Sequence, residues 1–526
     1  MEKPAIAQSA NSDRLAYLWL VIAIAISLFA AGRWTIPLAA WLAPVFLLRF
    51  VRTQRIITGL LLTWLVKFAV STITSQGTIL YPGIVPYAIL LFSSLVITFP
   101  FLIDRLIGTQ LKGFIATLAF PLAYTTLEFL SSNGPFGSFL STAYTQYGNL
   151  PLMQLVSVTG IWGITFLIAW FAGVVNWAWE REFAWAEINY GSLVFGAVLS
   201  MVLLGGGARL VFFTPQTATV RVAGLSASQT AVAAFSRQMP NETLDLLLSG
   251  KASQADRASA RSAFTIIDND LFNRSQQEAV AGAKIIAWPE SSPTGAAVLQ
   301  EDQPALLQQA STLAKQEGVY LNLGLAVFLN ETNNPPFLMD EAVLIDPAGN
   351  VVWTYEKTHS APGEAGLFKL GDGKVPVVAS PYGRLANVIC FDLDFPGMLR
   401  QAGQAGVDLL LGPSDDWQAI DPAHTQKAVF RAIENGFSLV RQASKGLSMS
   451  VDYEGRVLAA SDYFTTDQQV MVAYVPVHGV HTIYATIGDL FAWLCIAGLV
   501  IIAGAAIFAH NRKFWPANPV ESSPKP

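Results

Sequence analysis

The stretch A-N-V-I-C-F-D-L-D-F, residues 386–395, contains a short apolar run that ends in a cysteine. A compact apolar run of this kind is typical of a buried β-strand. The chain has only 2 cysteines, and the other one, Cys495, lies in a long apolar segment. A thiol without a nearby second cysteine is either a small buried side chain or a free reactive group. The surrounding sequence has to decide between these interpretations for Cys390.

The composition indicates a membrane protein. Of the 526 residues, 52% are hydrophobic and only 13% are charged, whereas about 25% of residues are charged in soluble domains. Most of the apolar runs that could cross a bilayer precede residue 214, and the first is expected to be retained because no convincing cleavage site follows it. The expected spans are Leu15–Ala31, Ile36–Leu48, Ile56–Thr74, Ile84–Ile103, Phe114–Ser131, Leu152–Trp177, Gly191–Phe213 and Ile487–Ala509.

Basic residues predict the orientation, because Lys and Arg accumulate in cytoplasmic loops. The loops at 75–83 and 132–150 contain neither Lys nor Arg, and Arg33 is the exception on that side. We therefore expect a membrane domain at 1–213, with about seven spans, and an extracytoplasmic domain at 214–486. A last helix at 487–509 and a cytoplasmic tail at 510–526 should follow. The basic residues assigned to the cytoplasm are Lys3, Arg14, Arg49, Arg52, Arg55, Arg105, Lys112, Arg181, Arg512 and Lys513.

Residues 214–486 alternate short apolar runs with helical patterns, which is typical of an α/β domain with a layered core. The net charge of -5, without a basic run, gives no sign of a nucleic-acid partner. The expected strands are Ala218–Leu225, Ala283–Trp288, Tyr320–Phe328, Glu341–Ile345, Val351–Lys357, Leu385–Cys390, Leu409–Leu411 and Ser438–Ala443, and the expected helices are Ala255–Ala281, Gln303–Glu317, Pro396–Ala405 and His424–Gly436.

Three chemically capable residues lie at the ends of these strands: Glu290 in A-W-P-E, Lys357 in T-Y-E-K and Cys390 in V-I-C-F-D. Strand ends are where α/β folds gather site residues. A cysteine nucleophile needs a base, and the oxyanion that it forms needs a nearby positive charge. Taken singly, the glutamate could be a solvated cap, the lysine a surface residue and the cysteine an inert core residue. Their coincidence on this strand pattern favours a catalytic site.

These motifs resemble the nitrilase or carbon-nitrogen hydrolase superfamily. The similarity rests on W-P-E at 288–290, Y-E-K-T-H-S-A-P-G-E at 355–364 and I-C-F-D at 389–392, and it continues at 409–417 and 424–436. It implies an α-β-β-α sandwich with a Glu-Lys-Cys catalytic set and no metal or cofactor. The apolar segments, with A-F-P-L-A-Y-T-T-L-E-F-L at 119–130, G-I-W-G-I-T-F-L at 160–167 and T-I-Y-A-T-I-G-D at 482–489, extend the resemblance to the apolipoprotein N-acyltransferases, the membrane-bound branch.

That resemblance implies a specific reaction in the bacterial inner membrane. A cysteine takes an acyl chain from a phospholipid as a thioester and passes it to the α-amino group of the diacylglyceryl-cysteine of a lipoprotein. By the match, Cys390 is the nucleophile, Glu290 the base and Lys357 the cation beside the oxyanion. Glu364 is expected to support Lys357 or the incoming amine.

The chain departs from the family pattern beside the nucleophile, where I-C-F-D replaces the usual I-C-Y-E. Phe391 and Asp392 are therefore candidate supporting or substrate-binding residues. P-G-E at 362–364 is one residue shorter than the usual P-F-G-E, S-D-D-W-Q-A replaces S-N-D-A-W-F-G, and no Trp occurs from 218 to 287. Two alternatives stay open: a membrane-tethered carbon-nitrogen hydrolase or acyltransferase that acts on another amine or on water, and a transporter-like or receptor protein that retains the fold without its chemistry.

Two ionisable residues, Lys67 and Glu128, fall within expected spans. Such residues are costly in a bilayer and usually face protein or water. Glu128 either makes a structural hydrogen bond between helices or helps to orient a headgroup or the acceptor.

Overall fold

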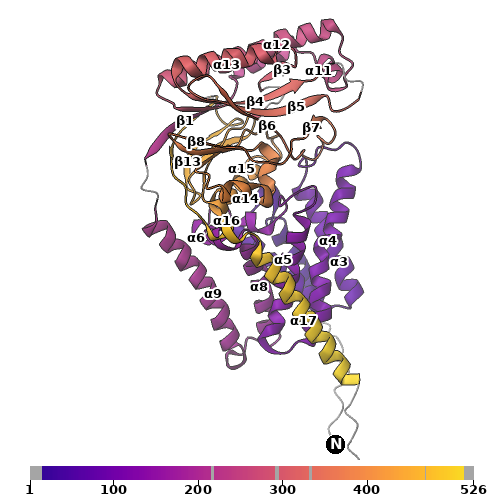
Figure 1. The fold of residues 1–526 in the computed structure, drawn as a ribbon. Coiled ribbons are helices and arrows are strands. Elements are labelled where there is room, and N and C mark those ends of the chain that lie inside the picture. The colour runs from indigo at the N-terminus through magenta and orange to yellow at the C-terminus, as the bar shows by residue number, and fades with distance from the viewer. Residues whose placement is uncertain (1–14, 215–217, 291–294, 331–333, 468, 515–526) are drawn as a thin grey trace, which may run out of the picture.

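The computed structural model describes residues 15–214, 218–290, 295–330, 334–467 and 469–514, with side chains described as far as residue 508. Helices gather at one end of the molecule and two β-sheets at the other (Figure 1). Part of the predicted orientation rests on Lys3 and Arg14, on the side chains of Arg512 and Lys513, and on the end of the tail. These lie outside the described residues.

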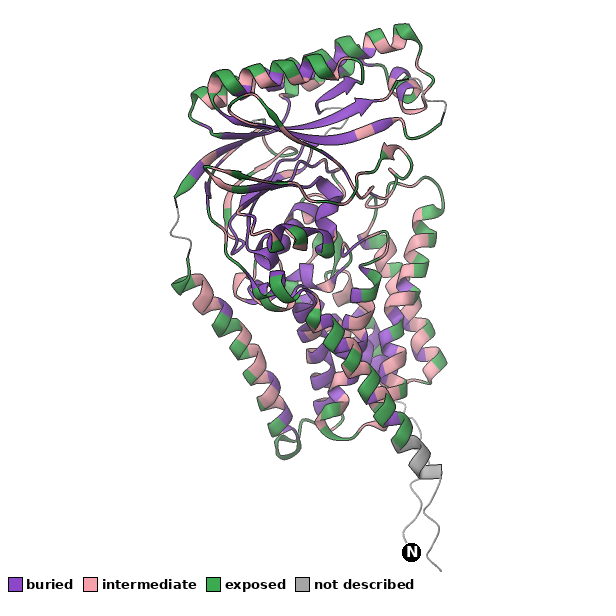
Figure 2. Ribbon diagram, in the orientation of Figure 1, coloured by how far each residue is buried: buried purple, intermediate pink, exposed green. Residues whose placement is uncertain are grey.

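Six helices in the described residues are long and apolar enough to cross a membrane. Their surfaces carry exposed apolar side chains such as Leu204, Phe212 and Ile501, and Figure 2 colours much of α9 and α17 as exposed. Large exposed apolar faces mark a surface that meets lipid or another apolar partner. These helices are α3 (Ile56–Thr74), α4 (Val85–Ile107), α5 (Ala119–Ser131, after a 3-10 turn at Gly113–Leu118), α8 (Trp162–Trp179), α9 (Trp185–Phe212) and α17 (Leu490–Phe514).

The first two expected spans form the helices α1 (Ala16–Ser27) and α2 (Pro37–Thr53), of which α2 extends beyond the expected end at Leu48. At a rise of about 1.5 Å per residue, α1 extends only about 18 Å, so it is shorter than the expected Leu15–Ala31 span. The chain turns at Gly32, which has a φ of +80° and lies so close to Thr74 that a Cβ atom there would be 2.8 Å from the threonine side chain. Helix α1 ends at Ser27, before this turn and before the expected boundary at Ala31.

The expected span Leu152–Trp177 is interrupted. The chain instead forms two short helices, α6 (Leu150–Met153) and α7 (Val156–Thr159), before α8 begins at Trp162. Gly160 separates α7 from α8 with a φ of +63°, and a Cβ atom there would lie 2.6 Å from the Tyr484 ring. A side chain other than hydrogen does not fit this conformation and contact, so the break is built into the sequence.

Two sheets form the other half of the described chain. The 8-stranded sheet has the order β14-β1-β2-β4-β5-β6, with β3 on β4 and β7 on β5, and the 6-stranded sheet has the order β13-β12-β11-β10-β9-β8. The strands of the first sheet are β1 (Thr219–Leu225), β2 (Ile285–Ala287), β3 (Ala297–Leu299), β4 (Tyr320–Phe328), β5 (Leu338–Ile345), β6 (Val351–Glu356), β7 (Phe368–Lys369) and β14 (Val470–Pro476). Those of the second are β8 (Val377–Ser380), β9 (Gly383–Asn387), β10 (Leu409–Leu411), β11 (Ser438–Arg441), β12 (Leu447–Val451) and β13 (Val457–Asp462).

The sheets pack face to face, and helices cover both outer faces. One apolar cluster joins the sheets, a second lies between the first sheet and its helices, and a third joins the second sheet to its helices and to the membrane helices. This is the expected α-β-β-α sandwich, so the predicted fold class is confirmed. The helices on the first sheet are α10 (Gln229–Gln238), α11 (Asn241–Leu248), α12 (Gln254–Val280) and α13 (Gln303–Glu317), and those on the second are α14 (Pro396–Gln404) and α15 (Ala423–Asn435), beside the short α16 (Ile483–Ile487).

The second sheet rests on the membrane helices through buried polar contacts as well as apolar ones. The backbone N–H of Ile161 donates to Glu434 Oε1 at 2.9 Å, and the Gln154 side chain donates to the backbone oxygen of Glu454 at 3.0 Å. Because the α15 side of the sandwich faces these helices (Figure 1), the edge from which site residues project is held close to the membrane domain.

Candidate active site

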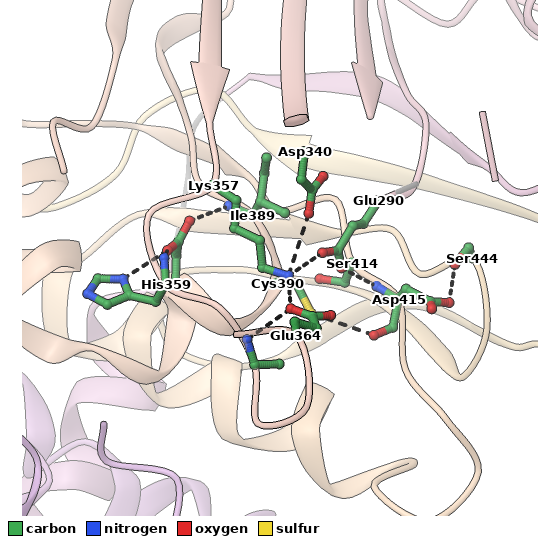
Figure 3. Close-up of polar contacts among 12 residues, drawn as sticks. Glu290, Asp340, Lys357, His359, Glu364, Ile389, Cys390, Ser414, Asp415 and Ser444 are labelled. Carbon is green, nitrogen blue, oxygen red and sulfur yellow. Dashed lines mark hydrogen bonds and ion pairs between the residues drawn. The ribbon is translucent and has the colours of Figure 1, made fainter. Parts of the chain in front are cut away.

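The three predicted residues converge from two sheets. β6 runs in the same direction as β2, because β5 is antiparallel to both β4 and β6 while β2 and β4 are parallel. Glu290 and Lys357 therefore leave the same edge of the first sheet. Cys390 follows β9 of the second sheet, and all three side chains lie in one cluster (Figure 3).

Lys357 lies at the centre of this cluster and is fully buried. Its Nζ atom is 2.6 Å from Glu290 Oε1, 3.0 Å from Glu364 Oε2 and 3.5 Å from Asp340 Oδ2. Burial alone would lower the pKa of the lysine, but the carboxylates of Glu290, Glu364 and Asp340 outweigh burial and hold the pKa well above its ordinary value. Lys357 is therefore a permanent cation at the site.

Hydrogen bonds to both carboxylate oxygens hold the Glu290 side chain in one orientation. Oε1 accepts from Lys357, and Oε2 accepts from the backbone N–H of Asp415 at 2.7 Å. Its own N–H donates to the backbone oxygen of Ser414, which ties the end of β2 to the loop after β10. A carboxylate with a fixed orientation and 3% exposure is suited to taking a proton from a neighbouring group.

Cys390 does not end the strand as expected. Pairing in β9 stops at Asn387, and Cys390 begins a 3-10 turn, Cys390–Asp394, with a φ of +46°. A non-glycine residue in this region is uncommon and is held there by its surroundings. The backbone N–H of Cys390 donates to the Pro413 oxygen at 2.9 Å, and Sγ lies 3.6 Å from the backbone oxygen of Asp415. The loop after β10 thus fixes the turn that carries the sulfur.

The thiol of Cys390 is 4% exposed. Burial first, and then the Glu290 carboxylate, raise its pKa well above the ordinary value, while the Lys357 ammonium acts in the opposite direction. The resting sulfur is accordingly protonated, and it needs a base before it can act as a nucleophile. Glu290 is a carboxylate placed to serve as that base.

Glu364 reaches Lys357 even though its motif is one residue shorter than the family pattern. Its Oε2 atom accepts from Lys357 Nζ at 3.0 Å and from the backbone N–H of Ala361 at 2.9 Å. Burial would raise the pKa of Glu364, but the Lys357 ammonium and the Ala361 amide outweigh burial and hold the pKa below its ordinary value. Glu364 thus contacts Lys357 directly, and its supporting role stays a prediction.

Asp392 and Phe391 brace the turn of the nucleophile. Asp392 accepts from the Tyr355 hydroxyl at 2.6 Å and from the backbone N–H groups of His359 and Ile389 at 2.9 and 3.1 Å. The Phe391 ring is 3% exposed and packs edge-on against Phe395. Both side chains are thus enclosed by the protein in this structure.

Glu128 lies in α5, within the membrane domain. Its carboxylate accepts hydrogen bonds from the Ser141, Thr142 and Thr165 hydroxyls and from the Thr142 backbone N–H. Lys67 lies over the Phe101 ring, 5.4 Å from its centre. The contacts of Glu128 match the structural alternative of the sequence analysis.

Sequence reasoning missed Asp340 and a group around His424. Asp340 is 1% exposed on β5, and burial followed by the Glu290 carboxylate raises its pKa well above its ordinary value. An acidic pair in an otherwise apolar strand, Asp340–Glu341, was the available signal.

Potential ligand atoms of Cys390, Asp416 and His424 lie within 4.8 Å of one another. However, the Arg441 guanidinium donates to both Asp416 oxygens at 2.7 and 2.9 Å, so this carboxylate already holds a cation from the protein.

Two family models match the chain. The carbon-nitrogen hydrolase model matches residues 238–485, and the model of the apolipoprotein N-acyltransferase N-terminal domain matches residues 16–174. A solved amidase from Nesterenkonia sp. is 19% identical, covers 52% of this chain and 95% of its own, and has a TM-score of 0.36.

Curated relatives extend across most of the chain. The apolipoprotein N-acyltransferase of Geobacter metallireducens is 26% identical over 475 residues, which are 85% of this chain and 81% of that protein. The enzyme of the same name from Bradyrhizobium diazoefficiens is 24% identical and covers 80% of each chain. A deaminated glutathione amidase from Mus musculus is 31% identical over 212 residues, 35% of this chain and 66% of that enzyme. With its membrane helices, its sandwich and the match at both ends, the chain belongs to the apolipoprotein N-acyltransferase family of carbon-nitrogen hydrolases.

Proposed function

We propose that the protein moves an acyl chain from a phospholipid to the α-amino group of the diacylglyceryl-cysteine of lipoproteins, through a thioester on Cys390. The observation that carries this proposal is the buried cluster of Glu290, Lys357 and Cys390 on a sandwich that packs against membrane helices. Both substrates are amphiphiles held in a bilayer, so a site at the junction with the membrane helices can meet both.

In the first half of the reaction, Glu290 accepts the thiol proton and the Cys390 thiolate attacks the ester carbonyl of the phospholipid. The developing oxyanion is stabilised by the Lys357 ammonium. When the tetrahedral intermediate collapses, the bond to the glycerol oxygen breaks. Glu290 returns its proton to that oxygen, and the lysophospholipid leaves with the acyl chain retained as a thioester.

In the second half, the neutral amine of the acceptor attacks the thioester carbonyl. Glu290 takes a proton from the attacking nitrogen, and the C–S bond breaks as the amide forms. The proton then returns from Glu290 to the sulfur, so the thiol is restored and the cycle balances. Glu364 and Asp340 keep the charge and position of Lys357 in both halves.

A cleft of about 510 Å³ supports an amphiphilic substrate, because it has both apolar and polar walls. It lies between the end of α5 and the two-sheet domain, and Phe129, Trp162 and Asp489 line its membrane side. On the other side it reaches His359 and Phe395, whose rings stack at 3.6 Å beside the turn of the nucleophile. We further propose residues 214–486 as the extracytoplasmic catalytic domain, with both termini cytoplasmic, in a bacterial inner membrane.

The test incubates full-length protein in detergent with a phospholipid that carries labelled acyl chains. A hydroxylamine-sensitive label on Cys390 is expected, and a diacylated lipopeptide should then take up the label as an amide. Cys390→Ser and Cys495→Ser form the matched pair, of which only the second should still acquire label. Wild-type protein without label on Cys390 would overturn the proposal. Label released as free fatty acid in the presence of the lipopeptide would favour a hydrolase instead.

A further inference from the structure

A second buried network of charged side chains reaches Cys390 from α15 and β11. His424, Asp416 and Arg441 are 3%, 1% and 0% exposed. His424 and Asp416 place ring nitrogen and carboxylate oxygen atoms within 4.8 Å of the Cys390 sulfur. The catalytic steps described above do not use these residues, so their position close to the nucleophile requires another explanation.

Both ring nitrogens of His424 face carboxylates. Nδ1 is 2.7 Å from Asp416 Oδ1, and Nε2 is 2.7 Å from Asp394 Oδ2. A neutral imidazole donates from only one nitrogen, so its second nitrogen would set a lone pair against a carboxylate oxygen. Arg441 lies 3.0 Å from Nδ1 and opposes a second proton, but the two shorter carboxylate contacts dominate. Burial would lower the pKa of His424, and the Asp416 and Asp394 carboxylates outweigh burial and raise the pKa.

The imidazole also joins two segments of the site. Asp394 belongs to the same 3-10 turn as Cys390. Asp416 belongs to the loop after β10, where the Asp415 N–H holds Glu290 and the Asp415 oxygen contacts the cysteine sulfur. A doubly protonated His424 therefore fixes the turn of the nucleophile relative to the loop that orients the base.

We infer that His424 is a positioning residue whose imidazolium clamps the Cys390 turn to the Asp416 loop and supplies fixed positive charge beside the sulfur. This inference rests on the proposed function only in taking Cys390 as the nucleophile. The charged groups around the sulfur and the imidazole come from several elements: Glu290 after β2, Lys357 and Glu364 after β6, Asp392 and Asp394 in the turn itself, Asp415 and Asp416 after β10, His424 and Lys427 on α15, and Arg441 on β11.

The electrostatic consequence follows from this set. If His424 were neutral, Asp394 and Asp416 would still have Lys427 near both and Arg441 on Asp416, but they would lose the cation that bridges them. The sulfur would then lose its proton with one nearby positive charge fewer, and loss of nearby positive charge disfavours a thiolate. With the imidazolium present, that positive charge lies within 4.8 Å of the sulfur.

The test measures alkylation of Cys390 by iodoacetamide in the full-length protein, over a range from about pH 6 to about pH 10, around the ordinary thiol pKa. The thiolate displaces iodide and forms an S–C bond, and peptide mass spectrometry separates Cys390 from Cys495. His424→Gln should shift the rate profile upward by about one pH unit, so that alkylation at a fixed lower pH is about tenfold slower. His478→Gln is the matched control, because His478 is 67% exposed near Asp408, and it should leave the profile unchanged.

Asp394→Asn distinguishes charge from packing, because it keeps an oxygen acceptor for His424 but removes a negative charge. It should shift the profile in the opposite direction, toward lower pH. The inference would be overturned if the rate profiles of both variants matched that of the wild type, or if both shifted to higher pH. If His424→Gln does not fold, His424→Asn is measured in its place: an upward shift supports the role, and an unchanged or lowered profile contradicts it. Alkylation needs neither phospholipid nor lipopeptide, so a failure of the proposed acyl transfer leaves this test valid.

Discussion

Around Lys357 three carboxylates share one ammonium, whereas Glu128 in α5 is surrounded by hydroxyl and amide donors. Lys357 is buried and Glu128 is half-buried, and each is a group that is costly to remove from water. At Glu128 the surroundings satisfy both carboxylate oxygens with neutral partners. At Lys357 the contact with Asp340 is a 3.5 Å ion pair, and neither oxygen of Asp340 has a hydrogen-bond donor among the described residues.

We propose that the difference separates a cluster that serves folding from one that serves chemistry. The hydroxyl and amide donors around Glu128 do not gain or lose protons near neutral pH. Their hydrogen bonds therefore stay the same, which suits a structural contact between helices. Three acidic groups around one cation hold more negative charge than that cation can balance, so the positions of protons depend on every member. Burial and the Glu290 carboxylate raise the pKa of Asp340, and this sensitivity to neighbouring charge is typical of catalytic sites.

Replacing Lys357 by Met tests the charged cluster and should have the largest effect. It removes the cation beside the oxyanion, and loss of one such stabilising group typically slows the chemical step by about 10² to 10³. The melting temperature should fall as well, because buried Glu290 and Asp340 and partly exposed Glu364 lose their partner. The rate of thioester formation and thermal melting in detergent are the two measurements.

A double variant separates the two effects of that substitution. Adding Glu364→Gln to Lys357→Met removes one of the uncompensated carboxylates, so it should recover part of the melting temperature and none of the rate. Recovery of the rate in the double variant would show that Lys357 acts only on stability and does not stabilise the oxyanion.

Asp415 shares a feature with each cluster. It is a carboxylate near the charged Glu290, and its own side chain accepts a hydrogen bond from the neutral Ser444 hydroxyl. Burial raises its pKa to about 7, against an ordinary value of 3.8. From about pH 4 to about pH 7 the folded protein keeps a proton that the unfolded chain has lost, so the free energy of unfolding falls as pH rises through this window. Above pH 7 this loss is complete.

Asp415→Asn stays uncharged at every pH and keeps an oxygen acceptor for Ser444. Its melting temperature relative to wild type should therefore be higher at pH 8 than at pH 5, by about 2–4 °C for each kcal/mol of difference in a domain of this size. Asp245→Asn, on the exposed face of α11, is the matched control and should show no such trend. A difference that is constant across this range would contradict the assignment to Asp415.

Regular local patterns were sufficient for much of the fold. The expected elements Ile56–Thr74, Gln303–Glu317 and Tyr320–Phe328 have the same bounds in the structure, because each has an unbroken helical or strand pattern between clear end signals. The order of Glu290, Lys357 and Cys390 at strand ends also predicted that they would meet, and their catalytic roles stay predictions.

What the sequence did not predict depends on contacts between distant segments. The strand before Cys390 stops at Asn387 because the turn is held by Pro413, Asp415 and Asp392, and the break before α8 depends on the packing of Gly160 against Tyr484. Asp340 and His424 lie on elements whose apolar periodicity is clear, but nothing local indicates that their side chains reach Lys357 or the cysteine turn. The acidic pair could have marked Asp340 as unusual, but the partners of both residues are found only when the sheets and helices are assembled.

Glu128→Gln tests the neutral cluster and should have the smallest effect on chemistry. The amide keeps one oxygen acceptor, and the hydroxyls of Ser141 and Thr165 can turn to accept from its nitrogen, so the cost should be about 1 kcal/mol, the net value of one hydrogen bond. Glu128→Ala, which leaves all the donors without a partner, should lower the melting temperature further. In both variants the rate of thioester formation should stay within about twofold of wild type, as expected when the folded site is unchanged. A slower thioester step at an unchanged melting temperature would instead assign Glu128 to the substrate, and the contrast with Lys357 would fail.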